Sequence, residues 1–169
     1  DKELSDEERS EYTVTLQTSL EKLTFLTNSL IKMSRLESGI ISLKPETNSL
    51  NDIVLQAVKT DYAKAKEKNI TMTFDCEQNF KALLDFNWTA EAITNVLDNA
   101  VKYTPSGGVI ELKMIEYPSY LRLDISDNGI GIPEEEQAKI FGRFYRGKQS
   151  AGIDGVGIGL YLTRDIVSK

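Results

Sequence analysis

The sequence predicts an α+β protein in which one long helix precedes a mixed set of helices and strands. No glycine or proline interrupts residues 5–38, whereas ten of the eleven glycines lie between Gly107 and Gly159. Two strand-like segments within residues 109–126 are separated by a short turn, which predicts a hairpin. A hairpin among unevenly spaced helices favours α+β over a doubly wound parallel sheet.

The composition excludes several kinds of catalysis. The 169 residues include no histidine, so this chain holds no histidine base, Ser-His-Asp triad or histidine-bound zinc. The lone Cys76 excludes an internal disulfide and a multi-thiolate metal site.

Charge and hydropathy set further expectations. With a formal charge of -6 we expect no nucleic-acid partner, although a local anion site is compatible with this balance. No apolar run approaches the roughly 18 to 20 residues that span a bilayer, and no signal segment opens the chain. A cytoplasmic location is therefore expected.

The first helix is expected over residues 5–38. Ser5 and Glu8 fit a capping box, and Gly39 followed by Pro45 is expected to end the helix. Its apolar residues recur in steps of four and three, and a helix cannot bury such a stripe alone. The partner is either a helix of the same domain or a helix of another chain, and the pattern alone favours neither. The stripe consists of Leu16, Leu20, Leu23, Leu26, Leu30 and Met33.

Helices and strands follow in mixed order. A helix is expected over 50–68, with Ser49 or Asn51 near its start. Alternating apolar and polar residues predict a strand over 70–75, and a short apolar run predicts another over 81–85. The apolar face of the helix consists of Ile53, Val54, Ala57, Val58 and Ala65.

The second half of the chain is expected to contain a helix, a hairpin and glycine-rich loops. The helix is expected over 89–103, before a turn at residues 105–108. The hairpin strands are expected over 109–116 and 120–126. Short helical pieces are expected over 134–141 and 159–169.

Four polar or amphipathic side chains share one face of the helix expected over 89–103, within an arc of about 100°. Asparagine is a mediocre helix former, so two asparagines one turn apart indicate a special role. The face is either a binding surface or an ordinary solvated surface with a tyrosine at its edge. The four residues are Asn95, Asn99, Lys102 and Tyr103.

A strand end rich in glycine offers a second set of candidate ligands. Asp127 ends a predicted strand, and its carboxylate can accept hydrogen bonds from an exocyclic amine while Gly129 and Gly131 let a flat ring approach. The alternative is a plain turn, because Asp-Asn-Gly is strong turn chemistry.

A third candidate is the segment 155–160, which leads into an apolar helical stretch. Glycines spaced by two at a helix start expose N–H groups to a phosphate, and a flexible hinge is the alternative. Leu160 stands where the dinucleotide fingerprint has its third glycine, so the segment does not match that fingerprint. Arg143, Arg146 and Lys148 supply positive charge nearby.

Taken together, four segments resemble the catalytic ATP-binding domain of bacterial sensor histidine kinases, in the ATPase superfamily shared with gyrase, Hsp90 and MutL. Residues 95–104 look like the N box and 127–132 like the first glycine box. Residues 141–147 look like the F box and 155–160 like the second glycine box. Each segment alone is a weak signal, but all four in this order are very specific.

The resemblance implies a domain organisation. Residues 44–169 are expected to form a two-layer α/β sandwich of the Bergerat type, which binds ATP. Residues 1–43 resemble the second helix of a dimerisation hairpin, which makes the leucine stripe the seam of a homodimer. The family's phosphoacceptor histidine lies on the first helix of that hairpin, and the family usually continues past the last helix, so both ends are expected to be cut.

The resemblance also implies residue roles. Asn99 is expected to hold Mg²⁺ that bridges the phosphates, in keeping with the preference of magnesium for oxygen ligands. Lys102 is expected to contact a phosphate and Arg146 to neutralise the γ-phosphate during transfer. Tyr103 is expected to stack beside the adenine and Asp127 to accept from its amino group. The remaining expected nucleotide contacts are Gly129, Gly131, Ile132, Phe144, Gly155, Gly157, Gly159 and Leu160, and residues 144–157 are expected to form a mobile lid.

Asn95 bears on the type of reaction that the resemblance implies. Gyrase-like ATPases have a glutamate there that activates water, and an amide has no basic pKa, so hydrolysis is disfavoured. A histidine acceptor needs no such carboxylate, because imidazole is itself a nucleophile near neutral pH. The expected catalytic residues are therefore Asn95, Lys102 and Arg146.

These expectations describe the ATP-binding part of a sensor histidine kinase. It would bind ATP with Mg²⁺ and donate the γ-phosphate to a histidine on the absent helix, in two-component signalling with a response regulator. The parent is expected to be a homodimeric, membrane-anchored receptor. The alternatives are a protein-serine kinase of the anti-sigma-factor type and a non-catalytic nucleotide-binding or interaction module.

Overall fold

The computed structural model describes residues 5–38, 43–75, 78–150, 153 and 155–169. The chain divides into two compact units, Asp1–Ser42 and Leu43–Lys169, and each is described by itself. Gly39, the predicted end of the first helix, and Cys76 lie outside the described residues. None of the helices in the described part of the chain combines the length and apolar character needed to cross a membrane.

The first unit is the helix α1, Asp6–Glu37, as predicted. The capping box is confirmed, because Ser5 N–H donates to Glu8 Oε2 at 2.8 Å and Glu8 N–H donates to Ser5 Oγ at 3.2 Å. Leucines of the predicted stripe stay largely exposed to solvent. The exposed fraction of the residue is 64% for Leu16, 62% for Leu20 and 59% for Leu23.

The second unit contains two sheets. In one sheet β2 pairs in parallel with β4, which pairs antiparallel with β5. The other is the antiparallel pair of β1 and β3. The elements are β1 Glu46–Ser49, α2 Leu50–Glu67, β2 Thr71–Asp75, β3 Lys81–Leu84, α3 Phe86–Tyr103, β4 Val109–Tyr117, β5 Tyr120–Asp127, α4 Glu134–Gln137, the 3-10 helix Lys148–Ser150 and α5 Gly159–Val167.

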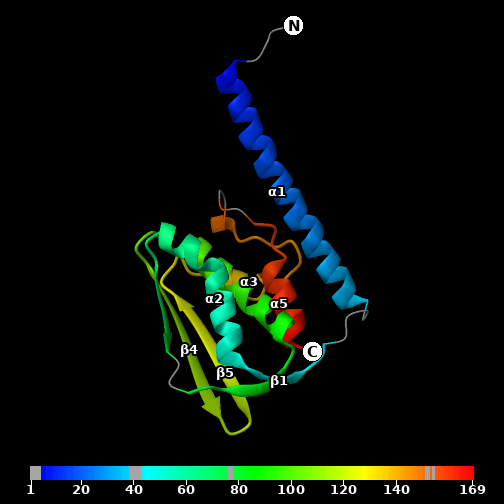
Figure 1. Cartoon of the computed structure of the whole chain (residues 1–169), viewed down its shortest axis with the longest axis vertical. Helices are drawn as coiled ribbons and strands as arrows, with labels where there is room; N and C mark the ends of the chain where they lie inside the picture. The colour runs from blue at the N-terminus through cyan, green and yellow to red at the C-terminus, as the bar shows by residue number, and fades with distance from the viewer. Residues whose placement is uncertain (1–4, 39–42, 76–77, 151–152, 154) are drawn as a thin grey trace. The chain divides into compact units, whose positions relative to one another are not determined.

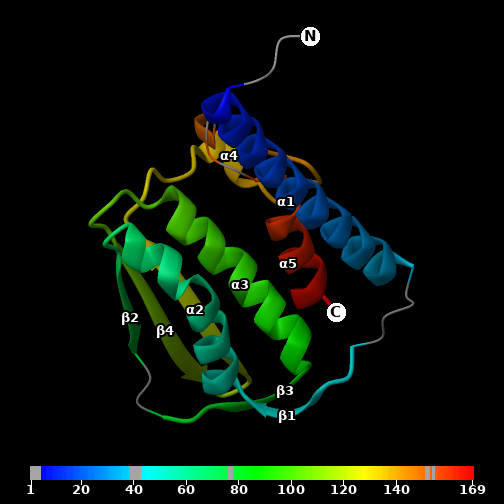
Figure 2. The same cartoon turned by 45° about the horizontal axis from the view of Figure 1, so that its top comes forward.

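Helices α2 and α3 form a layer over one face of the three-stranded sheet, and α5 lies beside α3 (Figures 1 and 2). The core fills the space between these layers, and the apolar face predicted for α2 is largely confirmed by the burial of Ile53, Val54 and Ala57. This arrangement confirms the predicted α+β class and the two-layer α/β sandwich. The most deeply buried apolar side chains include Ile53, Val54, Leu97, Val101, Ile110 and Leu112.

Some predicted boundaries are wrong. The strand β1 was not expected, because the sequence Glu-Thr-Asn-Ser shows no apolar alternation and pairing with β3 is a non-local interaction. The helix expected over 134–141 ends at Gln137, where Lys139 N–H donates to the Glu136 carbonyl in a tighter turn. Helix α3 begins at Phe86 instead of residue 89, because Asp85 accepts from Trp88 N–H as its N-cap.

A network of ion pairs among four charged side chains joins α2 to α3. Asp98 Oδ2 lies 2.5 Å from Lys102 Nζ, and Asp98 Oδ1 lies 3.0 Å from Lys64 Nζ. Lys64 also lies 3.1 Å from the buried carboxylate of Asp61. Burial by itself would raise the pKa of Asp98, but hydrogen bonds and charge from Lys102 and Lys64 lower it overall. Burial raises the pKa of Asp61, despite its contact with Lys64.

The substitution Asp98→Asn tests whether this network of ion pairs stabilises the fold. The folded pKa of Asp98 lies below its unfolded value, so its contribution is complete above about pH 4 and is lost as the pH falls through the folded pKa. At pH 7 we expect the free energy of unfolding to fall by about 1 to 2 kcal/mol in the variant. Below about pH 4 the difference from wild type should shrink.

Urea unfolding followed by circular dichroism at pH 7 and at low pH measures this difference. Asp124→Asn is the matched control, because Asp124 pairs with Arg122 at 2.7 Å on the solvent-accessible face of β5 and should contribute no measurable stability. If Asp98→Asn lowers the free energy of unfolding equally at both pH values, the ionised Asp98 carboxylate is not the source of the stabilisation.

Candidate functional site

Helix α3 has one apolar and one polar face, as its sequence predicts. Ile93, Leu97 and Ala100 are buried in the core, while the polar residues of the opposite arc are only half-buried. Lys102 pairs with Asp98 of the same helix. The half-buried residues are Asn95, Asn99, Lys102 and Tyr103.

The start of α5 lies against the middle of α3. A Cβ placed on Gly159 would lie 3.2 Å from Asn95 Oδ1, and Thr163 Oγ1 donates to the Ala92 carbonyl at 3.3 Å. The Nδ2 atom of Asn95 is buried and has no hydrogen-bond partner in the described part of the chain. Because a buried amide donor without a partner is costly, this group indicates a place for a ligand or an ordered water.

The first glycine loop lies against the end of α3. Gly129 N–H donates to Asp127 Oδ1 at 2.9 Å, and Ile130 N–H donates to the Tyr103 carbonyl at 3.3 Å. A Cβ on Gly129 would lie 2.6 Å from that carbonyl oxygen, so only glycine allows this approach. The structure therefore brings the Tyr103 carbonyl together with the loop that carries Asp127 and Gly129, which lies far from Tyr103 in the sequence.

The second glycine loop packs on the F-box segment. Gly157 has a φ of +75°, and a Cβ there would lie 2.8 Å from the carbonyl carbon of Phe144. Phe144 itself has a φ of 56°, a left-handed conformation that is costly for a bulky residue. Backbone packing between the two segments fixes the base of the predicted lid.

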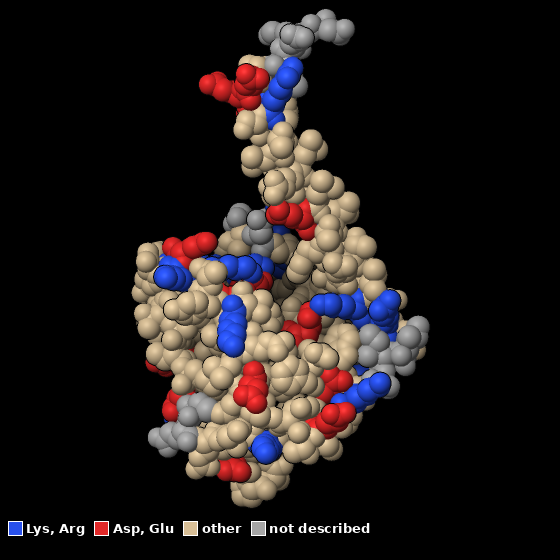
Figure 3. Space-filling model, in the orientation of Figure 1, with Lys and Arg blue, Asp and Glu red and all other residues tan. Residues whose placement is uncertain are grey.

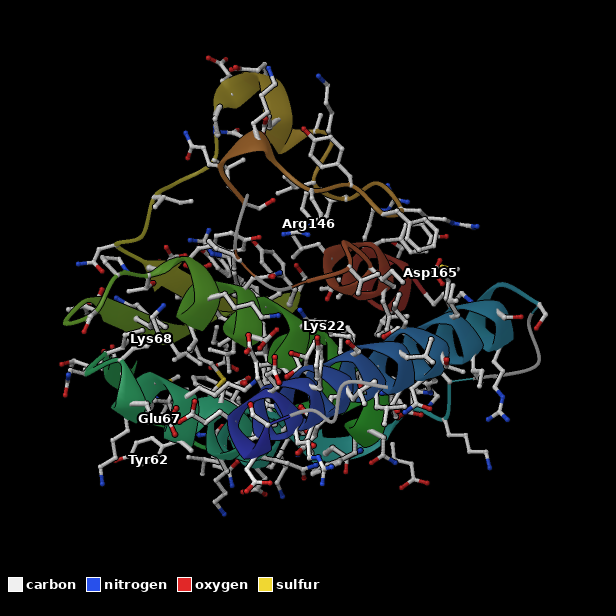
Figure 4. All side chains as sticks on the ribbon, turned by 90° about the horizontal axis from the view of Figure 1, so that it is seen from above. Lys22, Tyr62, Glu67, Lys68, Arg146 and Asp165 are labelled. Atoms are coloured by element: carbon white, nitrogen blue, oxygen red, sulfur yellow. The ribbon has the colours of Figure 1, made fainter. Side chains whose placement is uncertain are left out.

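Arg146 binds its own loop. Its Nη2 atom donates to the Ser150 carbonyl at 2.8 Å and to the Ile153 carbonyl. In Figure 4 Arg146 lies on the segment that follows α4. The described hydrogen bonds of Arg146 thus organise the predicted lid, and its expected contact with a phosphate stays a prediction.

Sequence reasoning missed Glu136. This residue is 5% exposed, and its Oε1 atom accepts from Lys148 N–H at 3.3 Å. A Cβ on Gly147 would lie 2.5 Å from Oε2, so the carboxylate lies directly against the F-box backbone. Nothing in the run of three glutamates distinguishes Glu136 from its neighbours, because only the tertiary fold buries it.

The other candidate cations have different surroundings. Arg143 Nη2 donates to the Tyr161 hydroxyl at 3.0 Å, and the guanidinium lies 4.9 Å from the centre of the Tyr161 ring. Lys148 is exposed at the start of the 3-10 helix. On the face that Figure 3 shows, basic and acidic side chains of the second unit are intermingled.

The loops that follow β5 and α4 expose apolar side chains. Ile130 is 51% exposed, Ile132 46% and Phe144 53%. A Cβ on Gly131 or on Gly155 would meet no heavy atom within 4 Å among the described residues. Leu160 is half-buried in the first turn of α5. Exposed apolar groups beside polar ones suit a flat ligand that is part apolar and part charged.

Comparison with known proteins identifies the family. Residues 85–169 match the family model described as histidine kinase-, DNA gyrase B-, and HSP90-like ATPase. The sensor histidine kinase Hik2 of Synechocystis sp. is 39% identical over 134 residues, which are 72% of this chain and 30% of that protein. The chain spans less than a third of the length of the curated relatives that it matches.

Solved structures have the same fold. Full-length ShkA, crystallised in complex with AMPPNP, matches 99% of this chain and 35% of that chain, with a TM-score of 0.81 and 24% identity. The histidine kinase ThkA, in complex with the response regulator protein TrrA, matches 85% of this chain and 42% of that chain, with a TM-score of 0.69 and 20% identity. The match to the family model over residues 85–169, together with this fold, shows that the chain belongs to the histidine kinase-, DNA gyrase B- and HSP90-like ATPases, and its relatives there are sensor histidine kinases.

Proposed function

We propose that the second unit binds ATP with Mg²⁺ and that the parent protein transfers the γ-phosphate to a histidine, for relay to a response regulator. The observation that carries the proposal is the convergence of two segments, the first glycine loop and the start of α5, on α3. The Tyr103 carbonyl accepts a hydrogen bond from the first glycine loop, and the Asn95 side chain packs against Gly159 at the start of α5. Family membership supports ATP as the ligand.

The residues present fit a magnesium nucleotide. Asn95 Nδ2 is a buried donor without a partner in the described residues, beside a helix start whose N–H groups favour an anion. Asn99, one turn further along α3, offers the amide oxygen that a hard cation accepts. Bound Mg²⁺ would supply charge neutralisation at the phosphates. Asp127 would accept from the adenine amino group, with Tyr103 beside the ring.

The roles in transfer follow from charge. Lys102 would exchange its contact with Asp98 for a phosphate oxygen, and Arg146 would turn from the carbonyls of its loop toward the γ-phosphate. Asn95 provides no base for activating water, which favours transfer to a nucleophilic acceptor over hydrolysis. The acceptor lies on another segment, because this chain has no histidine.

The proposed partners follow from the first unit and from the family. The exposed leucines of α1 would pair in a homodimer, because an apolar stripe on a single helix needs a partner helix. The solved complex of ThkA with TrrA supports a response regulator as the next acceptor of the phosphoryl group. The parent would act in the cytoplasm as part of a membrane-anchored receptor.

The substitution Asn99→Ala tests the metal assignment. Loss of the amide oxygen should remove the gain in ATP affinity that Mg²⁺ gives, weakening binding by at least about tenfold in its presence. Binding without Mg²⁺ should change little. Isothermal titration calorimetry with and without Mg²⁺ measures both quantities. Asn28→Ala on α1 is the matched control, and an unchanged Mg²⁺ dependence in Asn99→Ala would show that the assignment is wrong.

The substitution Arg146→Ala tests the transfer step. The chain is mixed with radiolabelled ATP and a separately made dimerisation hairpin that bears a histidine. We expect acid-labile phosphate on the hairpin, formed at least about a hundredfold more slowly by the variant, because a cation at the transferred phosphoryl group stabilises the transition state. Arg122→Ala, which removes an exposed side chain of β5, is the matched control.

Two outcomes would contradict the proposed reaction. Acid-stable phosphate on the hairpin would indicate a hydroxyl acceptor, as in the protein-serine kinases. Absence of ATP binding by the wild-type chain, with and without Mg²⁺, would reject both kinases and leave an interaction module.

A further inference from the structure

The end of α3 is held by a side chain from a different helix. Lys68 follows the last turn of α2, and its Nζ atom donates to the carbonyl oxygens of Val101 at 2.7 Å, Lys102 at 3.1 Å and Thr104 at 2.6 Å. The last carbonyls of a helix have no partner within the helix and carry its negative dipole end. One ammonium group thus satisfies three acceptors with its three donors.

The backbone of Lys68 completes the connection. Its carbonyl accepts from Gly107 N–H at 2.9 Å and from Ser106 Oγ at 2.8 Å. The next residue, Asn69, turns the chain with a φ of 54°. Side chain and backbone therefore bind opposite ends of the turn that joins α3 to β4, and Figure 4 labels Lys68 at this position.

The Lys68 ammonium donates to the carbonyls of residues 101, 102 and 104, and the Tyr103 carbonyl between them has a different partner. This oxygen accepts instead from Ile130 N–H, and Gly129 packs directly on it. Four successive carbonyls at the end of α3 are thus divided between Lys68 and the first glycine loop. A shift of the helix end would move the Tyr103 carbonyl and, with it, the loop that carries Asp127.

We propose that Lys68 is a positioning residue for the nucleotide site, which acts by fixing the Tyr103 carbonyl against the first glycine loop. The part that concerns nucleotide rests on the proposed function. Lys68 lies outside the residues 85–169 that match the family model. Within the described part of the chain, its side chain reaches a residue assigned to the phosphates only through its hydrogen bond to the Lys102 carbonyl. Its expected effect is on the base side of the site, where Tyr103 and Asp127 lie.

The test compares Lys68→Met, which keeps the length of the side chain and removes the donors, with Lys68→Arg, which keeps the charge and donors. Lys66→Met, an exposed position in the last turn of α2, is the matched control. Amide hydrogen exchange of the whole 169-residue chain, measured by NMR, reports on each segment. Calorimetric titration with ATP and with inorganic tripolyphosphate separates the base side from the phosphate side.

In Lys68→Met we expect the Gly107 and Ile130 amides to exchange at least about tenfold faster, while the β4 amides keep wild-type rates. ATP affinity should fall by about tenfold and tripolyphosphate affinity should stay within about twofold of wild type. Lys68→Arg should recover most of both effects, and Lys66→Met should resemble wild type.

Three results would overturn the proposal. Exchange in Lys68→Met could match that of Lys66→Met, or it could accelerate uniformly through β4, which would indicate general support of the fold. Equal losses of ATP and tripolyphosphate affinity would also contradict a role on the base side. If the wild-type chain binds no ATP, the proposed function fails, and the exchange comparison still decides whether Lys68 fixes the loop.

Discussion

The carbonyl oxygens at the end of α3 connect the core of the second unit to its candidate site. Helix ends expose acceptors that need partners, and here the partners come from two directions: the ammonium of Lys68 and the N–H of Ile130. Leu97 and Val101 fix the same helix against the sheet. The core determines where α3 lies, and the last carbonyls of α3 determine where the first glycine loop lies. The position of the candidate site therefore depends on the packing of the core.

The cations of the candidate site also have partners within the protein. Lys102 and Arg146 carry the positive charge expected at the phosphates, and both have intramolecular acceptors in this structure, Asp98 and the carbonyls of residues 150 and 153. These contacts keep the cations satisfied before a ligand arrives. A bound nucleotide would exchange one set of acceptors for another, so its net effect on charge solvation is smaller than the phosphate contacts alone suggest.

Backbone packing has a comparable role around the predicted lid. Gly157 approaches Phe144 and Tyr145 at distances that exclude a side chain, and the carboxylate of Glu136 occupies the space beside Gly147. Phe144 holds a left-handed conformation within this contact. The F box and the second glycine box thus form one packed assembly at the ends of the segment between them, which is a suitable anchor for a segment that closes over a ligand.

The sequence by itself determined the class of fold, the order of nearly all the long elements and the two faces of α3, because hydrophobic period and capping residues are local properties of the chain. The glycine positions also indicated two candidate ligand loops, at residues 127–132 and 155–160. The tertiary structure alone decided what the pairing of distant segments creates. It placed β1 beside β3, buried Glu136 against Gly147, and directed Lys68 to the end of α3. These contacts join residues about 11 to 38 positions apart, so no local pattern encodes them, and their energies appear only when the layers pack.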